Sequence, residues 1–282
     1  MGYVEKLRES AEKNGSIVCM GMDPVLEKIP ISRGDAEKKI TKFYTDILDA
    51  AESENAKPGI LKPNYAFYAQ YGFPGLRALE NVMKYAHKKG LMVIMDGKRA
   101  DIGKTSAAYA KEAFDFWKAD SVTLAPYMGK DSLMPFIEQT EKGKGVYILV
   151  RTSNMGALDI QSLKVDGKTV FMKTAEKVAG DWHKPGVGAV VGATAPKELE
   201  EISKFFVSTG KEVPLLIPGV GAQGGTAQEV VSALKKSGND LALHRINSSS
   251  GLNYAYEKYK TDDYAGAAVK AIKELNREIG FT

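Results

Sequence analysis

The chain has 282 residues, of which 44% are hydrophobic and 26% charged, and 39 basic against 35 acidic side chains give a formal net charge of +4. This composition is typical of a globular protein and excludes a disordered or a fibrous one. The charges are scattered along the sequence, which argues against nucleic acid binding, because that function needs basic residues gathered on one face.

The sequence also indicates in which compartment the protein lies and whether it binds a metal. A single cysteine, Cys19, excludes an intrachain disulfide and a cysteine-based zinc cluster, and it is typical of a reducing compartment. The three histidines lack metal-ligand spacing, so we expect no metal site. The amino terminus lacks the features of a signal peptide, and no segment approaches the roughly 18 apolar residues of a membrane span. We therefore expect a cytoplasmic protein without membrane contact.

Short apolar runs alternate along the chain with segments of helical periodicity. The predicted strands cover residues 17–22, 59–62, 91–96, 121–125, 146–151, 188–192, 213–218 and 241–247. The predicted helices cover residues 36–51, 75–89, 104–117, 131–140, 170–182, 196–209, 226–236 and 262–279. Strands and helices in this alternation predict a (β/α)8 TIM barrel, with residues 1–282 as a single domain. A doubly wound open sheet is the competing architecture.

Polar residues collect directly after the predicted strands. The carboxyl ends of all strands of an α/β barrel face one mouth, where active sites lie. The residues expected at this mouth are Asp23, Lys62, Asn64, Asp96, Lys98, Pro126, Arg151, Ser153, Thr194 and the segments 218–225 and 247–251. The one long connection, residues 152–168, is predicted to be a loop over the site rather than a domain boundary.

The largest group of candidate catalytic residues lies at the end of the third predicted strand, where residues 91–105 read LMVIMDGKRADIGKT. Asp96 and Lys98 are two positions apart and should project to the same side, and Asp101 lies just beyond them on the turn. Buried together with Lys62, they would form a network in which each charge favours the ionised form of its neighbours. A protonated lysine in such a network is a positioned proton donor. The alternative is a set of exposed ion pairs worth about 0 to 1 kcal/mol each.

Two further loops are suited to an anion. The segment 218–225, PGVGAQGG, follows the seventh predicted strand and precedes a helix. Its glycines would let backbone amides approach an anion closely, and the helix start would add a favourable dipole. The segment 247–251, NSSSG, offers further amides and hydroxyls, and the loops after strands seven and eight are the usual phosphate site of α/β barrels. A pair of tight turns is the alternative, and neither loop carries a Walker A or dinucleotide fingerprint.

Together these residues resemble the orotidine 5'-phosphate decarboxylase family. The family pattern DxKxxDIGxT is present as Asp96, Lys98, Asp101, Ile102, Gly103 and Thr105. The LKPN around Lys62, the RTSN at 151–154 and the PGVGAQGG loop extend the resemblance over most of the chain, to the longer, bacterial-type branch of the family. The DxKxxD part alone is less specific, because sugar-phosphate decarboxylases and aldolases of the same superfamily share it.

The resemblance implies decarboxylation of orotidine 5'-monophosphate to UMP and CO2 in de novo pyrimidine synthesis, without a metal or an organic cofactor. Asp96 would crowd the substrate carboxylate, Lys98 would protonate C6, and Lys62 would order the array. Asp101 and Thr105 would reach the active site of the partner subunit in a homodimer. The substrate-binding residues implied are Asp23 at the ribose, Ser153 at the pyrimidine, Gln223 with neighbouring amides at the phosphate, and Pro218, Gly224, Ser249 and Ser250.

One position departs from the family pattern. The motif after strand eight usually reads NSSR, with the arginine binding phosphate, whereas this chain has Ser250. Arg245 lies five residues earlier and is not expected to reach, so either amides, hydroxyls and Gln223 hold the phosphate or another cation substitutes. Two rival functions stay open. A metal-dependent decarboxylase or aldolase of sugar phosphates would need an acidic ligand where Met95 stands, and a barrel that binds nucleotide without turnover is compatible with Ser250.

Overall fold

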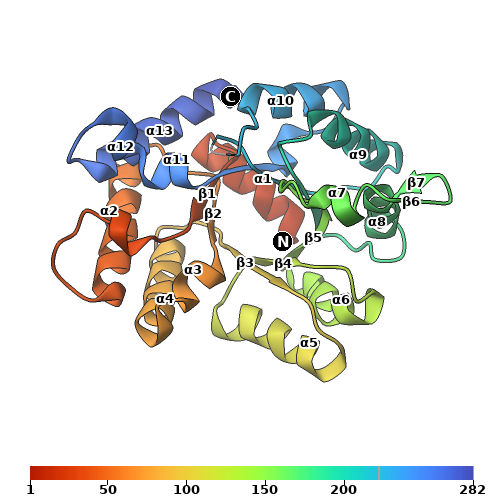
Figure 1. The fold of residues 1–282 in the computed structure, drawn as a ribbon, viewed down its shortest axis with the longest axis horizontal. Coiled ribbons are helices and arrows are strands. Elements are labelled where there is room, and N and C mark those ends of the chain that lie inside the picture. The colour runs from red at the N-terminus through yellow and green to blue at the C-terminus, as the bar shows by residue number, and fades with distance from the viewer. Residues whose placement is uncertain (222, 282) are drawn as a thin grey trace.

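In the computed structural model, which describes residues 1–221 and 223–281, eight parallel strands form one sheet with helices around it (Figure 1). Neighbouring strands follow the order β2-β1-β10-β9-β8-β5-β4-β3. Bridges from Leu61 to Val93 and from Asn64 to Asp96 join β2 to β3 and close the sheet into a barrel. The structure confirms the predicted (β/α)8 barrel and excludes the competing open sheet. The barrel strands are β1 (Val18–Met22), β2 (Ile60–Pro63), β3 (Ile94–Arg99), β4 (Ser121–Leu124), β5 (Gly145–Arg151), β8 (Val187–Val191), β9 (Leu215–Pro218) and β10 (Arg245–Ser248).

Each predicted helix is present, and further helices lie outside the predicted ranges. None of the helices in the described part of the chain has the length and apolarity that crossing a membrane requires. The helices are α1 (Tyr3–Asn14), α2 (Ala36–Ser53), α3 (Tyr65–Ala69), α4 (Gly72–Lys88), α5 (Gly103–Lys111), α6 (Lys130–Ile137), α7 (Ala157–Ile160), α8 (Val170–Ala179), α9 (Pro196–Ser208), α10 (Ala227–Lys236), α11 (Ser250–Asn253), α12 (Ala255–Tyr259) and α13 (Tyr264–Ile279).

Two predicted strands differ from the observed ones by more than two residues at one end or both. The third was predicted over 91–96, but β3 continues to Arg99, and its register against β4 shifts between Met95 and Arg99. The charged residues therefore belong to the strand itself, although the apolar pattern stops before them. The eighth was predicted over 241–247, but Leu241–Leu243 form a single 3-10 turn, capped by the Asp240 side chain, and β10 begins only at Arg245.

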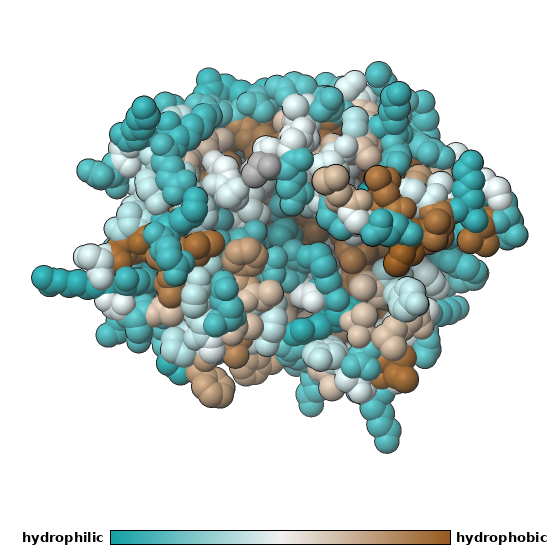
Figure 2. Space-filling model, viewed as in Figure 1, coloured by the Kyte–Doolittle hydropathy of each residue, from teal (hydrophilic) through white to brown (hydrophobic). Residues whose placement is uncertain are grey.

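The connection at 152–168 is only partly the loop expected over a site. Beyond its first residues it forms the short helix α7 and a two-stranded hairpin of β6 (Lys164–Val165) and β7 (Lys168–Thr169). This hairpin projects at the edge of the molecule (Figure 1). Apolar side chains are exposed along α7 and the hairpin, and they form the brown region on that side of Figure 2.

The helix α1, which the sequence reading did not include, packs against the amino ends of the strands. The Tyr3 hydroxyl donates a hydrogen bond to Ser121 Oγ at 2.7 Å and lies 3.2 Å from the Tyr147 hydroxyl. All three residues are buried. Because α1 covers this end of the barrel, the carboxyl ends of the strands carry the cavity described below.

Arg245, at the first position of β10, is fully buried beneath α1. Its guanidinium donates hydrogen bonds to the backbone carbonyls of Leu7 in α1, of Ala242 at 3.0 Å and of His244 at 2.7 Å. These bonds offset part of the cost of burying the charge, although Nε of Arg245 has no hydrogen-bond partner among the described residues. Arg245 therefore links α1 to the start of β10, at the end of the barrel opposite to the cavity.

We expect Arg245→Met to lower the free energy of unfolding by about 3 kcal/mol or more, because it leaves buried carbonyls without donors. Arg8→Met, in the helix α1 that Arg245 contacts, is the matched control. Arg8 forms surface ion pairs with Glu212 and Asp240, which should contribute about 0 to 1 kcal/mol. Urea unfolding of the two variants measures the difference, and equal losses would contradict a structural role specific to Arg245.

Candidate active site

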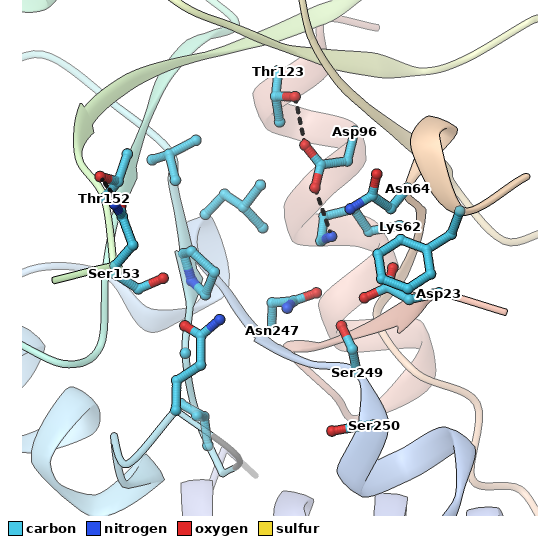
Figure 3. Close-up of a pocket in the computed structure, with 18 of the residues that line it drawn as sticks. Asp23, Lys62, Asn64, Asp96, Thr123, Thr152, Ser153, Asn247, Ser249 and Ser250 are labelled. Carbon is cyan, nitrogen blue, oxygen red and sulfur yellow. Dashed lines mark hydrogen bonds and ion pairs between the residues drawn. The ribbon is translucent and has the colours of Figure 1, made fainter. Parts of the chain in front are cut away.

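A cavity of about 730 Å³ opens at the carboxyl ends of the strands. Its volume lies within the usual range for small-molecule sites. Apolar side chains of Leu149, Val190 and Leu216 form part of its wall, and polar side chains from the strand ends form most of the rest. Figure 2 shows a hollow near the centre of this face, and Figure 3 shows how the polar side chains converge on it.

At one side of the cavity, two lysines bracket one carboxylate. Lys62 Nζ, from β2, lies 3.0 Å from Asp96 Oδ2, and Lys98 Nζ lies 2.7 Å from Asp96 Oδ1. The side chains of Lys62 and Asp96 are 5% and 7% exposed, whereas that of Lys98 is 49% exposed and lines the cavity. This burial rejects the alternative of exposed surface ion pairs. The three charged groups form a lysine–aspartate–lysine cluster that lines the cavity, and Lys98 is its most exposed member.

Thr123 on β4 holds this cluster in place. Its hydroxyl donates to Asp96 Oδ1 at 2.8 Å (Figure 3). The same hydroxyl accepts the backbone N–H of Lys98 at 2.9 Å. Lys98 has φ +44°, in the left-handed region that is uncommon for residues other than glycine. The bond from its N–H helps to hold that conformation, which turns the ammonium back toward Asp96. The sequence analysis did not identify Thr123, although it is one of two hydroxyl residues in the short buried strand SVTL.

The charges in the cluster are fixed by their neighbours. Burial by itself acts to raise the pKa of Asp96, but the ammonium groups of Lys62 and Lys98 outweigh it and hold that pKa well below its ordinary value. Burial likewise acts to lower the pKa of Lys62, and the carboxylates of Asp96 and Asp23 outweigh it and hold the pKa above its ordinary value. Asp96 and Lys62 are therefore both ionised at neutral pH.

Most of the residues predicted for substrate binding line this cavity. Asp23 Oδ1 and Asn247 Oδ1 are buried acceptors without a hydrogen-bond partner among the described residues, so they can accept hydrogen bonds from ligand hydroxyl or N–H groups. The predicted residues in the wall are Asp23, Lys62, Asp96, Lys98, Ser153, Pro218, Gln223, Ser249 and Ser250. Asn64 and Asn247, which were expected at the barrel mouth, line the cavity too. Wall residues that the sequence did not single out include Lys28, Thr123, Thr152 and Tyr254.

The glycine-rich loop after β9 differs from the predicted anion cradle. Gly219, Gly221 and Gly224 have φ of +105°, +90° and +92°, which favours glycine at each position. The N–H groups of Gly221, Gly224 and Gly225 donate to the carbonyls of Gly225, Gly221 and Gly219, within the loop itself. These amides are therefore occupied, and Gly224 does not line the cavity.

Only part of the glycine-rich loop faces the cavity. Gln223 lines it, together with Pro218 and Gly219, while Ala222 lies outside the described residues. The first turn of α10 is not part of the wall, so the expected contribution of its helix dipole is not found.

Asp101 and Thr105, predicted as part of the site, do not line the cavity of their own chain. Asp101 Oδ1 accepts the N–H of Ile102 at 2.8 Å, and Thr105 is exposed on α5. The cluster of Lys62, Asp96 and Lys98 thus forms without the predicted second carboxylate.

Arg151 and Arg245, the two arginines that the sequence analysis considered, do not line the cavity either. Arg151, expected at the mouth, is buried and pairs with Glu198 on α9. Arg245 does not reach the cavity, as expected, because its guanidinium is held beneath α1 at the other end of the barrel. Within residues 1–221 and 223–281, no three His, Cys, Asp or Glu side chains are grouped so that they could hold a metal ion.

A (β/α)8 barrel with an ionised lysine–aspartate–lysine cluster in the cavity at its strand ends is the architecture of a barrel enzyme. The model of the orotidine 5'-phosphate decarboxylase / HUMPS family matches residues 16–242, and the chain belongs to this family.

Relatives of the chain carry consistent names. An orotidine 5'-phosphate decarboxylase of Halorubrum lacusprofundi is 39% identical over 99% of both chains. One of Cupriavidus taiwanensis is 39% identical over 95% of this chain and 94% of its own. Among solved structures, the OMP decarboxylase of Leishmania donovani is 29% identical, with a TM-score of 0.78 over 99% of both chains.

Because the pKa of Asp96 lies below its ordinary value of 3.8, its charged form stabilises the fold above about pH 4. That contribution is lost as the pH falls toward the folded-state pKa. At neutral pH we expect Asp96→Asn to cost about 3 kcal/mol, since it leaves the buried Lys62 without its carboxylate. The difference in the free energy of unfolding between wild type and Asp96→Asn should fall by about 1 kcal/mol when the pH is lowered from about 5 to about 3.

Urea unfolding at both pH values measures this difference. Asp262→Asn, at an exposed position, is the control and should change little at either pH. If the loss of unfolding free energy in Asp96→Asn is the same at both pH values, the lowered pKa of Asp96 is contradicted.

Proposed function

We propose that the protein decarboxylates orotidine 5'-monophosphate to UMP and CO2 in de novo pyrimidine synthesis, without a metal or an organic cofactor. The observation that carries this proposal is the buried Lys62–Asp96 pair with Lys98 beside it in a cavity large enough for a nucleotide. The names of the relatives that are 39% identical support the substrate. A single domain over residues 1–282 and a cytoplasmic location stay predictions.

In this reaction the bond between C6 and the carboxyl group breaks, CO2 leaves, and the electron pair stays on C6. Lys98 Nζ donates a proton to C6 and later regains one from solvent. An ammonium held beside C6 interacts more strongly with the carbanion that develops than with the neutral ring, so it stabilises the transition state selectively. Asp96, fixed by Lys62 and Thr123, would face the substrate carboxylate and disfavour it in the ground state. Departure of CO2 relieves that repulsion.

The remaining wall residues suit the rest of a nucleotide. Asp23, with its unpartnered buried Oδ1, is suited to accept a ribose hydroxyl. Ser153 at the end of β5 would contact the pyrimidine. Pro218, Gln223, Ser249 and Ser250 line the side of the cavity assigned to the phosphate. Gly224 would contribute its amide only if the loop rearranges around the ligand, as loops over active sites commonly do.

We propose a homodimer in which Asp101 and Thr105 complete the partner's site. Both residues lie outside the cavity of their own chain. Apolar side chains on adjacent loops support an interface at this rim, since Ile102, Tyr127 and Met128 are 52%, 89% and 44% exposed. Exposed apolar side chains grouped in this way commonly mark contacts between subunits.

Purified protein in EDTA should convert orotidine 5'-monophosphate to UMP, measured as a loss of ultraviolet absorbance. Lys98→Ala should reduce turnover by at least about a thousandfold, because it removes both the proton donor and the charge beside C6, while UMP still binds. Lys130→Ala on α6, outside the cavity wall, is the control and should keep full activity. Activity that appears only with added magnesium would favour the metal-dependent rival, and nucleotide binding without turnover would favour the binding protein.

The shared site can be tested by mixing two inactive variants. In a mixed dimer of Lys98→Ala and Asp101→Ala chains, one of the two sites combines an intact Lys98 with an intact Asp101. Random exchange of subunits should therefore restore about a quarter of wild-type activity. Each variant mixed with itself is the control. Exchange is followed with differently tagged chains, and the absence of rescue after complete exchange would refute donation by the partner.

A further inference from the structure

We propose that Lys28 supplies the positive charge that binds the substrate phosphate in this protein. The inference rests on the proposed function, because it takes the ligand to be a nucleotide with a 5'-phosphate. It assigns the role of the family arginine, which Ser250 replaces, to a residue on a different strand–helix connection.

Lys28 is the one cation of the described cavity wall that the catalytic cluster does not use. Three lysines line the cavity, and two of them, Lys62 and Lys98, are paired with Asp96. Lys28 lies on the 3-10 turn Leu26–Lys28 that follows β1. No arginine is among the described wall residues. A phosphate in this cavity therefore has Lys28 as its available cationic partner.

The position of Lys28 places it beside the segment where the arginine would stand. Its Nζ lies 5.3 Å from the centre of the Tyr254 ring, and the Tyr254 N–H donates to the carbonyl of Ser250 at 3.0 Å. The ring itself is fixed, because its hydroxyl donates to the Asp23 carbonyl and accepts the N–H of Val25. The ammonium of Lys28 thus lies beside the ring of Tyr254, whose backbone is one helical turn beyond Ser250, and Lys28 and Ser250 both line the same cavity.

The glycine-rich loop increases the need for a cation. Its amides at Gly221, Gly224 and Gly225 are bonded within the loop, and the Gln223 side chain is neutral. Hydroxyls of Ser249 and Ser250 can donate hydrogen bonds to a phosphate but cannot neutralise its charge. Hydrogen bonds between an ammonium and a phosphate are roughly twice as strong as those between neutral groups.

Lys28 is also free to change partner. Its Nζ pairs with the Glu257 carboxylate on α12 at 3.0 and 3.2 Å, and both side chains are 46% exposed. Such exposed pairs contribute little to stability. A phosphate dianion in a partly closed cavity is a stronger partner than this carboxylate, so we infer that Lys28 leaves Glu257 for the phosphate when the nucleotide binds.

Calorimetric titration with UMP and with uridine tests the assignment, since the two ligands differ only in the phosphate. Lys28→Gln should weaken UMP binding about ten- to a hundredfold and leave uridine binding unchanged. Lys28→Arg should keep most of the affinity for UMP. Lys258→Gln is the matched control, because Lys258 lies on α12, pairs with Glu274 and is not part of the described wall. Glu257→Gln should strengthen UMP binding by releasing Lys28.

A second variant tests whether the charge itself is what matters. Ser250→Arg in the Lys28→Gln background should restore UMP affinity to near the wild-type value. Equal losses for UMP and uridine, or no loss for Lys28→Gln, would overturn the assignment. Binding does not require turnover, so a protein that binds UMP through Lys28 but does not decarboxylate orotidine 5'-monophosphate would refute the proposed function alone. A wild-type protein without preference for UMP over uridine would refute the role of Lys28.

Discussion

The structure depends on one buried carboxylate held between two ammonium groups. Burying Asp96 or Lys62 alone would cost several kcal/mol, and only close pairing offsets that cost. The pair also spans the place where the barrel closes, because β2 and β3 are joined by isolated bridges, one of them from Asn64 to Asp96. Thr123 ties the same carboxylate to β4. The seam of the barrel and the charged centre of the site are therefore held by the same contacts.

The two ends of the barrel use buried charge in different ways. At the amino end, backbone carbonyls, including that of Leu7 in α1, accept hydrogen bonds from the two terminal nitrogens of Arg245, and this residue does not line the cavity. At the carboxyl end, Lys62 is satisfied by a carboxylate that itself lines the cavity. A charge neutralised by an ionised partner leaves that partner fixed and oriented, which is what a preorganised site requires. The buried charge at the amino end thus serves the fold alone, whereas the buried pair at the carboxyl end both lines the cavity and holds the seam of the barrel.

The barrel and the proximity of Asp96 to Lys98 could be predicted from local order in the sequence. Lys62, on β2, could be expected beside them because the carboxyl ends of barrel strands face one mouth. Alternating apolar and helical segments indicate the fold, and the spacing of Asp96 and Lys98 puts both on one side. Thr123 and Lys28 could not be found in that way, since their roles follow from contacts between segments far apart in the chain. The loop at 218–225 was read as a cradle because glycines permit that geometry. Its composition does not reveal that the loop amides bond to one another.

In the proposed reaction, the charges in the cavity divide between binding and chemistry. Lys62 and Asp96 are buried, and Lys98, although 49% exposed, is held by Asp96 and by the Thr123 hydroxyl on its backbone N–H, which suits groups that must be in place before the carbanion develops. Lys28 is a half-exposed cation on a flexible stem at the rim, and its present partner, Glu257, is equally exposed. A mobile charge can follow a phosphate into the cavity, whereas a mobile charge beside C6 would lose the benefit of preorganisation. Binding energy gained at the rim can then hold the pyrimidine against Asp96, where its carboxylate would otherwise be repelled.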